Sequence, residues 1–400
     1  MRHWRDRRLM VLALALAVTC LCGWLFKAHC TPGGWTGGEQ YTTGCYSDAM
    51  PFWSLRGVDK GQIPYLQARM EYPVLTGAQI WLEGAITHAL FGVEARDFHF
   101  LGVVSAVNAL FAGLILWMFR QGGMDRSRLW AWAAAPPLIL YLGHNWDLGA
   151  GVLAVAAMLL ARSGRLVRAA ATAALGAAAK LFPVLMLPLI GLSALFGESG
   201  WRHRVTRAAA CTAAAIGAWT VVNLPVALLA PENWSEFYRF SQERPGTAAS
   251  TWEVLSSMGW WTTAIADRNL YATLLFGTGA ALIVALGWKR HRAHLWVLFT
   301  PVLAWFMLSN KVYSPQFDLW LYPVLLMTAP RLWPVALFVI GDIAAYFAEF
   351  WWFAGMENAW PYATSTDIAT AASIRAAAML VIIVDAVRRD PPAWIARPES

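Results

Sequence analysis

Residues 9–26 read LMVLALALAVTCLCGWLF, a continuous run with no charged side chain. A helix rises 1.5 Å per residue, so this run is about 27 Å long and approaches the ~30 Å hydrocarbon core of a bilayer. A second uncharged run, from Phe100 to Phe119, is slightly longer. The repetition of such runs predicts an all-α polytopic membrane protein.

The composition agrees with this prediction. Hydrophobic residues make up 58% of the 400 residues and charged residues only 14%, whereas soluble domains are about a quarter charged. We therefore expect a single membrane domain over 1–400 rather than two or three soluble domains. The net charge of +7 is spread over short clusters between apolar runs, which is typical of membrane orientation and excludes a nucleic-acid-binding surface.

The basic start MRHWRDRR predicts a cytoplasmic N-terminus and places the loop after Phe26 outside the cytoplasm. A cleaved signal peptide is the alternative, but no convincing small-residue cleavage site follows the run. If an odd number of spans separates Phe26 from Arg120, all later basic clusters face the cytoplasm. These clusters lie at 120–128, 162–168, 202–207, 289–292 and 388–389.

The stretch 74–93 decides this count. It is apolar but contains Gln79, Glu83 and His88, and ionisable groups are costly inside a bilayer. We therefore expect an amphipathic helix on the outer membrane surface. If 74–93 spanned instead, every later basic cluster would face outward.

The expected fold has about twelve transmembrane helices: a first span, an extracytoplasmic loop over 27–97 that carries the amphipathic helix, a core over 98–387 and a cytoplasmic tail over 388–400. Several helices are short, so their outer turns should surround a water-filled cavity. The expected spans are 9–26, 98–119, 129–143, 146–161, 167–181, 182–197, 207–229, 269–288, 295–309, 316–329, 332–353 and 369–387.

Two cysteines, Cys30 and Cys45, lie in the first outer loop. An oxidising compartment would allow them to form a disulfide, and two free thiols are the alternative. Cys20, Cys22 and Cys211 fall within apolar runs and are expected to be small hydrophobic residues.

The outer segments are rich in aromatic and charged residues, the first loop including Arg69 and Glu71. Such surfaces suit sugars, although an interfacial aromatic belt has a similar composition. Three further polar motifs fall at the expected outer ends of spans. They are GHNWDLGA with His144, Asn145 and Asp147, AAKLFP with Lys180, and SNKVYSPQ with Lys311, Tyr313 and Gln316.

Lys180 and Lys311 would lie at similar depth on the same side, where they could bind a lipid phosphate. Snorkelling is the alternative for each lysine, and helix capping for the Asn and Asp residues. The spacing of His144, Asn145 and Asp147 is not a strong metal-ligand pattern, so we expect no metal. No nucleotide-binding or hydrolase motif is present.

Several of these strings resemble the GT-C superfamily of glycosyltransferases, and within it glycosyltransferase family 87, the polyprenyl-phosphate-mannose-dependent α-mannosyltransferases of actinobacterial envelopes. The resemblance covers roughly 10–330. Its strings are CYSDAMPFW, MEYPVLTG, GHNWDLGA, GAAAKLFPVLMLPL and NKVYSPQFDLWLYP.

The resemblance implies that Asp48 is the catalytic base and that Glu71 and Tyr72 match the acidic-aromatic step before the amphipathic helix. Some relatives have a histidine near the donor phosphate, but no His occurs in 230–268 or 309–316, so Lys180 or Lys311 would take that role. Asp59 and Glu71 are the competing carboxylates. A helix N-cap is the alternative role for Asp48.

The expected reaction moves a sugar from a polyprenyl-phosphate donor to an envelope glycolipid or glycan acceptor with inversion, on the extracytoplasmic side of the plasma membrane and without a cofactor. Mannose is favoured and arabinose is the alternative; the acceptor, linkage position and oligomeric state stay open. The alternative functions are a lipid-linked saccharide flippase or transporter, and a non-catalytic scaffold for envelope synthesis.

Overall fold

The computed structural model describes residues 2–197 and 200–396. The side chains of residues 1–8, which carry the basic start, and the last four residues of the expected tail lie outside this described part. The chain is 76% helical, and its described part contains no strand. The predicted all-α class is therefore confirmed.

Within the described residues, six helices are long and apolar enough to cross a membrane. They are α1 (Arg2–Ala28), α5 (Asp97–Gln121), α11 (Trp201–Leu229), α14 (Ile265–His291), α17 (Trp333–Met356) and α18 (Ser365–Arg388).

The remaining helices are shorter. They are α2 (Glu39–Thr42), α3 (Ala49–Leu55), α4 (Val74–Phe91), α6 (Arg126–Ala133), α7 (Pro136–Tyr141), α8 (Leu148–Arg162), α9 (Leu166–Ala177), α10 (Met186–Leu195), α12 (Pro231–Glu243), α13 (Thr251–Ser257), α15 (Phe299–Ser309), α16 (Asp318–Thr328) and α19 (Ala393–Ala396). Five 3₁₀ turns join them: η1 (Thr31–Gly33), η2 (Gly92–Glu94), η3 (Phe182–Leu185), η4 (Leu295–Leu298) and η5 (Pro315–Phe317).

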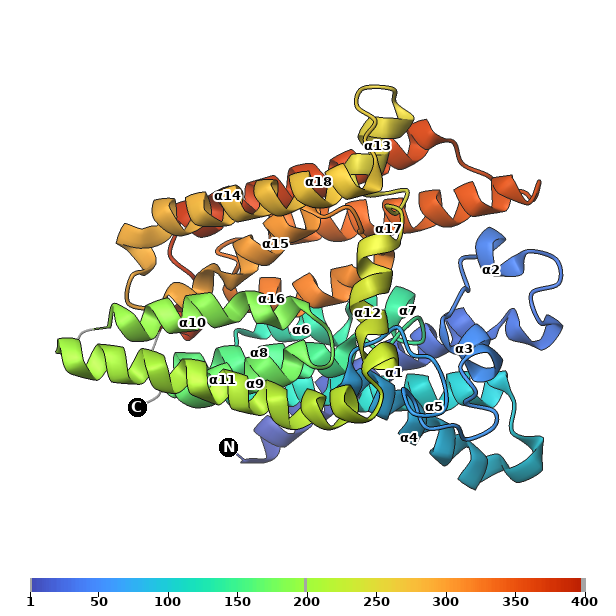
Figure 1. Cartoon of the computed structure of the whole chain (residues 1–400), viewed down its shortest axis with the longest axis horizontal. Helices are drawn as coiled ribbons and strands as arrows, with labels where there is room; N and C mark the ends of the chain where they lie inside the picture. The colour runs from blue at the N-terminus through green and yellow to red at the C-terminus, as the bar shows by residue number, and fades with distance from the viewer. Residues whose placement is uncertain (1, 198–199, 397–400) are drawn as a thin grey trace.

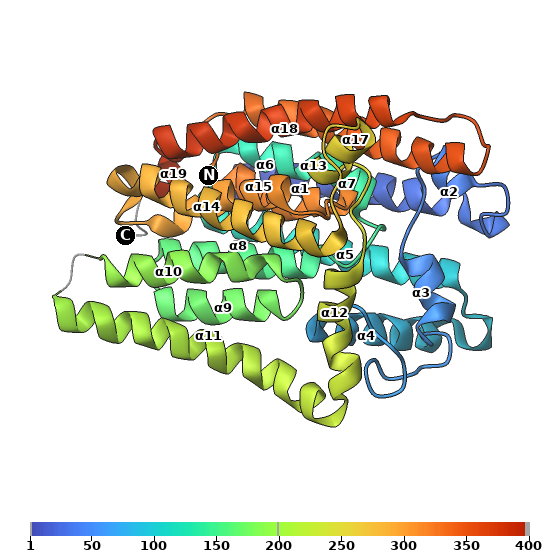
Figure 2. The same cartoon turned by 45° about the horizontal axis from the view of Figure 1, so that its top comes forward.

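Most helices lie side by side in one elongated bundle (Figures 1 and 2). Both ends of the chain lie at the same end of this bundle. The segments that carry α2, α3 and α4 lie at the opposite end. The polar motifs of the first loop are therefore far from the termini.

The expected spans coincide with helices, but not all of these helices are long. The span expected at 129–143 is divided into α6 and α7, since Pro136 cannot donate an N–H bond and begins a new helix. Four other apolar helical segments contain only 10–17 residues. The presence of membrane helices is thus supported by length and composition, while the number of about twelve stays a prediction.

The close packing of α17 against α18 depends on Gly341. A Cβ built on Gly341 of α17 would lie 2.6 Å from the backbone nitrogen of Arg375 on α18. Only glycine allows the two backbones to approach this closely. The approach brings the Arg375 side chain into the interior of the bundle, where it is 2% exposed.

The segment before α5 has a small apolar core of its own. Buried residues of α3, the following loop and α4 pack against the start of α5 and against Trp146. The helix expected at 74–93 forms as α4, and it is not among the candidate spans. Glu83 lies on its buried face, whereas Leu82, Leu90 and Phe91 are exposed.

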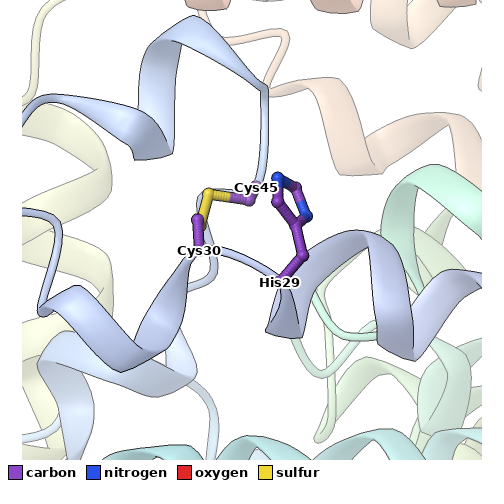
Figure 3. Close-up of side chains that lie close together, drawn as sticks. All are labelled: His29, Cys30 and Cys45. Atoms are coloured by element: carbon purple, nitrogen blue, oxygen red, sulfur yellow. A yellow bond between two sulfur atoms is a disulfide. The ribbon is translucent and has the colours of Figure 1, made fainter.

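A disulfide joins Cys30 and Cys45, as the sequence suggested. Figure 3 shows it at the end of the first helix, with His29 beside it. His29, Cys30 and Cys45 could together offer ligand atoms to a metal, but both sulfur atoms are already used by the disulfide. The bond ties the end of the first apolar helix to the irregular stretch that leads to Asp48.

Candidate active site around Asp48

Asp48 lies at the N-terminal end of α3, but its side chain does not cap that helix. The Ser47 hydroxyl instead accepts a hydrogen bond from the Ala49 amide at 3.2 Å. The backbone N–H of Asp48 donates to the His144 carbonyl at 2.9 Å, which fixes the residue against the turn after α7. The capping role considered for this carboxylate is therefore not supported.

Three side chains donate to the Asp48 carboxylate. The Tyr46 hydroxyl lies 2.9 Å from Oδ1, the Asn145 amide 2.5 Å from Oδ2, and the Tyr72 hydroxyl 3.4 Å from Oδ2. Tyr72 also accepts a hydrogen bond from Asn145 at 2.7 Å. The carboxylate is thus held in one orientation while remaining partly exposed.

Two turns at the same end of the bundle complete the cluster. The turn between α7 and α8 supplies Asn145 and Asp147, and the turn after α9 supplies Lys180. The Lys180 ammonium lies 3.0 Å from Asn145 Oδ1 and 3.3 Å from Asp147 Oδ1, and 4.2 Å from the centre of the Tyr72 ring. Sequence motifs that are far apart along the chain therefore meet within one polar cluster.

The surroundings of Asp48 raise the pKa of its carboxyl group. Burial raises the pKa of the Asp48 carboxyl above its ordinary value; the Tyr46 hydrogen bond and the charge of Lys180 act in the opposite direction. The pKa values of the Tyr46 and Tyr72 hydroxyls are also raised, Tyr46 chiefly by the Asp48 charge and Tyr72 chiefly by burial. Both phenols thus stay protonated and donate to the carboxylate, which is the arrangement a general base requires.

His144 is buried beside the cluster. Its Nδ1 lies 3.2 Å from the Lys27 ammonium, which also contacts the Tyr346 hydroxyl and the Gly44 carbonyl. Burial, followed by the charges of Lys27 and Lys180, lowers the pKa of His144. The imidazole is therefore neutral and contacts Lys27. It is the backbone carbonyl of His144 that contacts Asp48, by accepting its N–H.

Two predicted residues of the first loop form ion pairs outside the cluster. Arg69 pairs with Glu236 of α12, and Glu71 receives two hydrogen bonds from Arg56, each 2.6 Å long. Only Tyr72 of this stretch reaches Asp48. Arg69 and Glu71 therefore hold the loop in place and do not contact Asp48.

The third polar motif is separated from Asp48. The Lys311 ammonium donates to the Gln242 carbonyl at 2.7 Å, and the Tyr313 hydroxyl donates to Asp318 at 2.5 Å. Gln316 is buried in the turn η5 before α16. The two lysines that were expected to act together thus occupy different surroundings: Lys180 is paired with a carboxylate, and Lys311 is not.

Arg244 is the residue that the sequence reasoning missed. It follows α12, is half-buried, lies over the Phe240 ring, and forms no ion pair with a described carboxylate. Burial lowers its pKa, and the nearby Tyr72 and Asp48 oppose that shift. Its only sequence signal was its place in the second aromatic outer loop.

Arg244 also links the two lysine environments. The pKa of the Lys311 ammonium is lowered by burial, and then by the positive charges of Arg244 and Arg268. Of these cations, Arg268 is paired with Glu253. Arg244 therefore places a cation within electrostatic reach of Asp48, Tyr72 and Glu349, and Lys311 lies within reach of Arg244.

Comparison with known proteins adds nothing to this geometry, since no protein-family model and no curated protein matches the chain.

Proposed function

We propose that this protein transfers a sugar, with mannose favoured, from a polyprenyl-phosphate donor to an envelope glycolipid or glycan acceptor. The observation that carries the proposal is the partly exposed Asp48 carboxylate, held by three donors and lying near an unpaired cation, Arg244. A base beside an anion-binding group is what glycosyl transfer from a phosphate requires.

In this mechanism the acceptor hydroxyl gives its proton to Asp48 as its oxygen attacks the anomeric carbon. The bond between that carbon and the phosphate oxygen breaks, and the polyprenyl phosphate leaves with both electrons. Arg244 and Lys311 stabilise the departing phosphate. Attack from the face opposite the leaving group gives inversion.

Lys180 takes a different part in this proposal from the one first expected. Its pairing with Asp147 and its contact with Asn145 suit a positioning residue for Asp48. Phosphate binding is assigned instead to the cations without a carboxylate partner. This division follows from charge, because a phosphate competes poorly for an ammonium that is already neutralised.

The test uses purified protein in phospholipid nanodiscs with radiolabelled polyprenyl-phosphate-mannose and a lipid extract from an actinobacterial envelope. We expect label to move from the donor to a slower-migrating lipid, and the Asp48→Asn variant to transfer far less. Failure of transfer with both mannose and arabinose donors contradicts the proposal. Movement of intact donor between leaflets without transfer would favour the flippase alternative.

The proposal also places Asp48 on the extracytoplasmic side of the plasma membrane and both termini in the cytoplasm. Cysteine substitutions at Lys60 and Arg126, in a Cys22→Ser background, test this in intact cells. An impermeant maleimide should label position 60 and not position 126. Labelling of both positions would make 74–93 a span, and labelling of position 126 alone would reverse the orientation.

A further inference from the structure

A cavity of about 300 Å³ lies between the loop after α3 and helix α4, separate from the Asp48 cluster. None of the residues predicted as part of a site lines it. Its walls are formed by Arg56, Val58, Gly61, Gln62, Pro64, Trp81, Ala85 and His88. Its volume is at the lower end of the range for small-molecule sites.

The cavity is built into the packing of the loop on α4. A Cβ on Gly84 would lie 2.5 Å from Val58, and one on Gly77 would lie 2.3 Å from the Tyr65 hydroxyl. These two glycines let the loop approach the helix at both points. His88 fixes the same loop through a hydrogen bond from Nε2 to the Val58 carbonyl, at 3.1 Å.

The lining indicates a neutral, polar ligand. The Arg56 charge is already neutralised by Glu71, so the cavity has no free cation to attract an anion. The Gln62 amide and the Trp81 indole N–H form no hydrogen bond with any described residue and are available to a ligand. Trp81 is 42% exposed, so its ring offers an aromatic face. An aromatic face with amide donors suits the hydroxyls and C–H surface of a sugar.

An apolar surface adjoins the cavity. The exposed side of α4 carries Leu82, Leu90 and Phe91, and Val93 follows the helix. A contiguous apolar stripe on an exposed helix is a lipid-contact surface. A ligand with its sugar in the cavity could place an attached apolar chain along this stripe. A sugar joined to an apolar chain is a glycolipid.

The cavity is also close to the proposed catalytic centre. The Arg56 guanidinium lies 5.3 Å from the centre of the Phe52 ring, and that ring lies 5.5 Å from the Tyr72 ring. Tyr72 in turn reaches Asp48 with its hydroxyl. A chain of contacts through Arg56, Phe52 and Tyr72 thus connects the cavity wall to the base.

We propose that this cavity binds the saccharide headgroup of a glycolipid acceptor, with its lipid portion along the exposed face of α4. The inference rests on the proposed transferase function and adds a binding site for the acceptor. Trp81 would stack on the sugar and Gln62 would hydrogen-bond its hydroxyls.

Binding is measured without transfer, by saturation-transfer NMR on wild-type protein in nanodiscs, with an alkyl mannobioside and free mannobiose as probes. We expect Trp81→Ala and Gln62→Ala to weaken binding of the alkyl mannobioside by about tenfold, as loss of a stacking or hydrogen-bonding contact does. The matched control is Trp260→Ala, since Trp260 is an exposed tryptophan of another loop, and it should bind like wild type.

Binding within twofold of wild type in both cavity variants would overturn the inference. Equal affinity for the two probes would also overturn it, since a glycolipid site must prefer the amphiphile. Protein that binds the probe but transfers no sugar would contradict the transferase proposal alone. Protein that transfers sugar with an acceptor KM unchanged by Trp81→Ala would contradict the cavity assignment alone.

Discussion

Two clusters of carboxylates lie in this protein, and they differ in how completely their charges are satisfied. Asp48 is partly exposed and lies near an unpaired cation. The second cluster, formed by Asp318, Asp342 and Arg375, is enclosed between α16, α17 and α18, where Asp318 and Asp342 are 0% exposed. Arg375 lies 3.3 Å from Asp318.

The buried cluster is closed by aromatic residues. The Tyr313 hydroxyl donates to Asp318 and the Tyr141 hydroxyl donates to Asp342, while the Arg375 guanidinium lies 3.7 Å from the centre of the Tyr313 ring. A ligand has no route to these groups except by displacing packed side chains. The comparison teaches that a carboxylate on a polar turn is available for chemistry, whereas the same group between helices acts in packing.

The largest expected effect concerns Asp48. Asp48→Asn keeps the shape of the side chain but removes the base, so turnover should fall by about 10²–10⁴. The thermal unfolding temperature should stay near that of wild type, because no capping bond is lost. Radiolabel transfer and differential scanning fluorimetry measure the two quantities. A folded variant with near-normal transfer would remove Asp48 from the mechanism.

The buried cluster should show the reverse pattern. Arg375→Met removes the cation that faces two enclosed carboxylates, and breaking such a pair costs about 3–5 kcal/mol of stability. We expect a large drop in thermal stability in detergent. Adding Asp318→Asn to the same variant should recover part of the loss. Unchanged stability in Arg375→Met would contradict the packing role.

Glu83 of α4 gives a third carboxylate for comparison, buried beside Trp146, whose indole donates to it at 2.6 Å. Burial raises its pKa to about 7 from 4.5. Because folding favours the protonated form, the contribution of Glu83 to the free energy of unfolding is fully present below pH 4.5. This contribution, about 3 kcal/mol in total, is lost as the pH rises through 7.

The Glu83→Gln substitution should flatten this dependence. At pH 8 we expect the variant to unfold at a higher temperature than wild type, and at pH 4 at a similar one. Thermal unfolding measured over pH 4–8 tests the prediction. A variant that is destabilised equally at every pH would show that the carboxylate is needed for its hydrogen bonds alone.

The cations Arg244 and Lys311 should affect binding of the donor. Arg244→Ala is expected to raise the apparent KM for polyprenyl-phosphate-mannose, since a charge-assisted contact contributes about 1.5–3 kcal/mol. Lys311→Ala should act in the same direction. Arg239→Ala is the matched control, because Arg239 lies on α12 shortly before Arg244 and is paired with Glu236. Equal effects of Arg244→Ala and Arg239→Ala would argue against a phosphate site.

The smallest expected effect is a shift in pH dependence. The Tyr46 hydrogen bond lowers the pKa of Asp48, so Tyr46→Phe should raise that pKa further. A base must be deprotonated to act, and the acidic limb of the transfer profile should therefore move to higher pH. Activity at the alkaline plateau should change little. A limb that stays in place would show that another group sets it.

Much of the fold could be predicted because its determinants are local. The uncharged run at 9–26 and the one within α5 indicate membrane helices by length and hydropathy alone. The stretch 74–93 was expected to form a helix, and it does so as α4. The spacing of Cys30 and Cys45 in a loop allowed the disulfide that the structure contains.

The candidate site was predicted in part. Asn145, Asp147 and Lys180 were chosen from polar motifs and Asp48 and Tyr72 from the resemblance, and the structure brings all five together. Arg69 and Glu71 were chosen on the same grounds but are paired elsewhere. The sequence contains no signal for pairing, since the partners Glu236 and Arg56 lie in other segments.

The sequence by itself thus determined that this is a helical membrane protein and which of its turns are polar, because hydropathy and turn chemistry depend on neighbouring residues. Only the tertiary structure decided that Lys180 is neutralised by Asp147 while Arg244 is left unpaired near Asp48. Charge pairing depends on distances between segments that the chain brings together only when it folds.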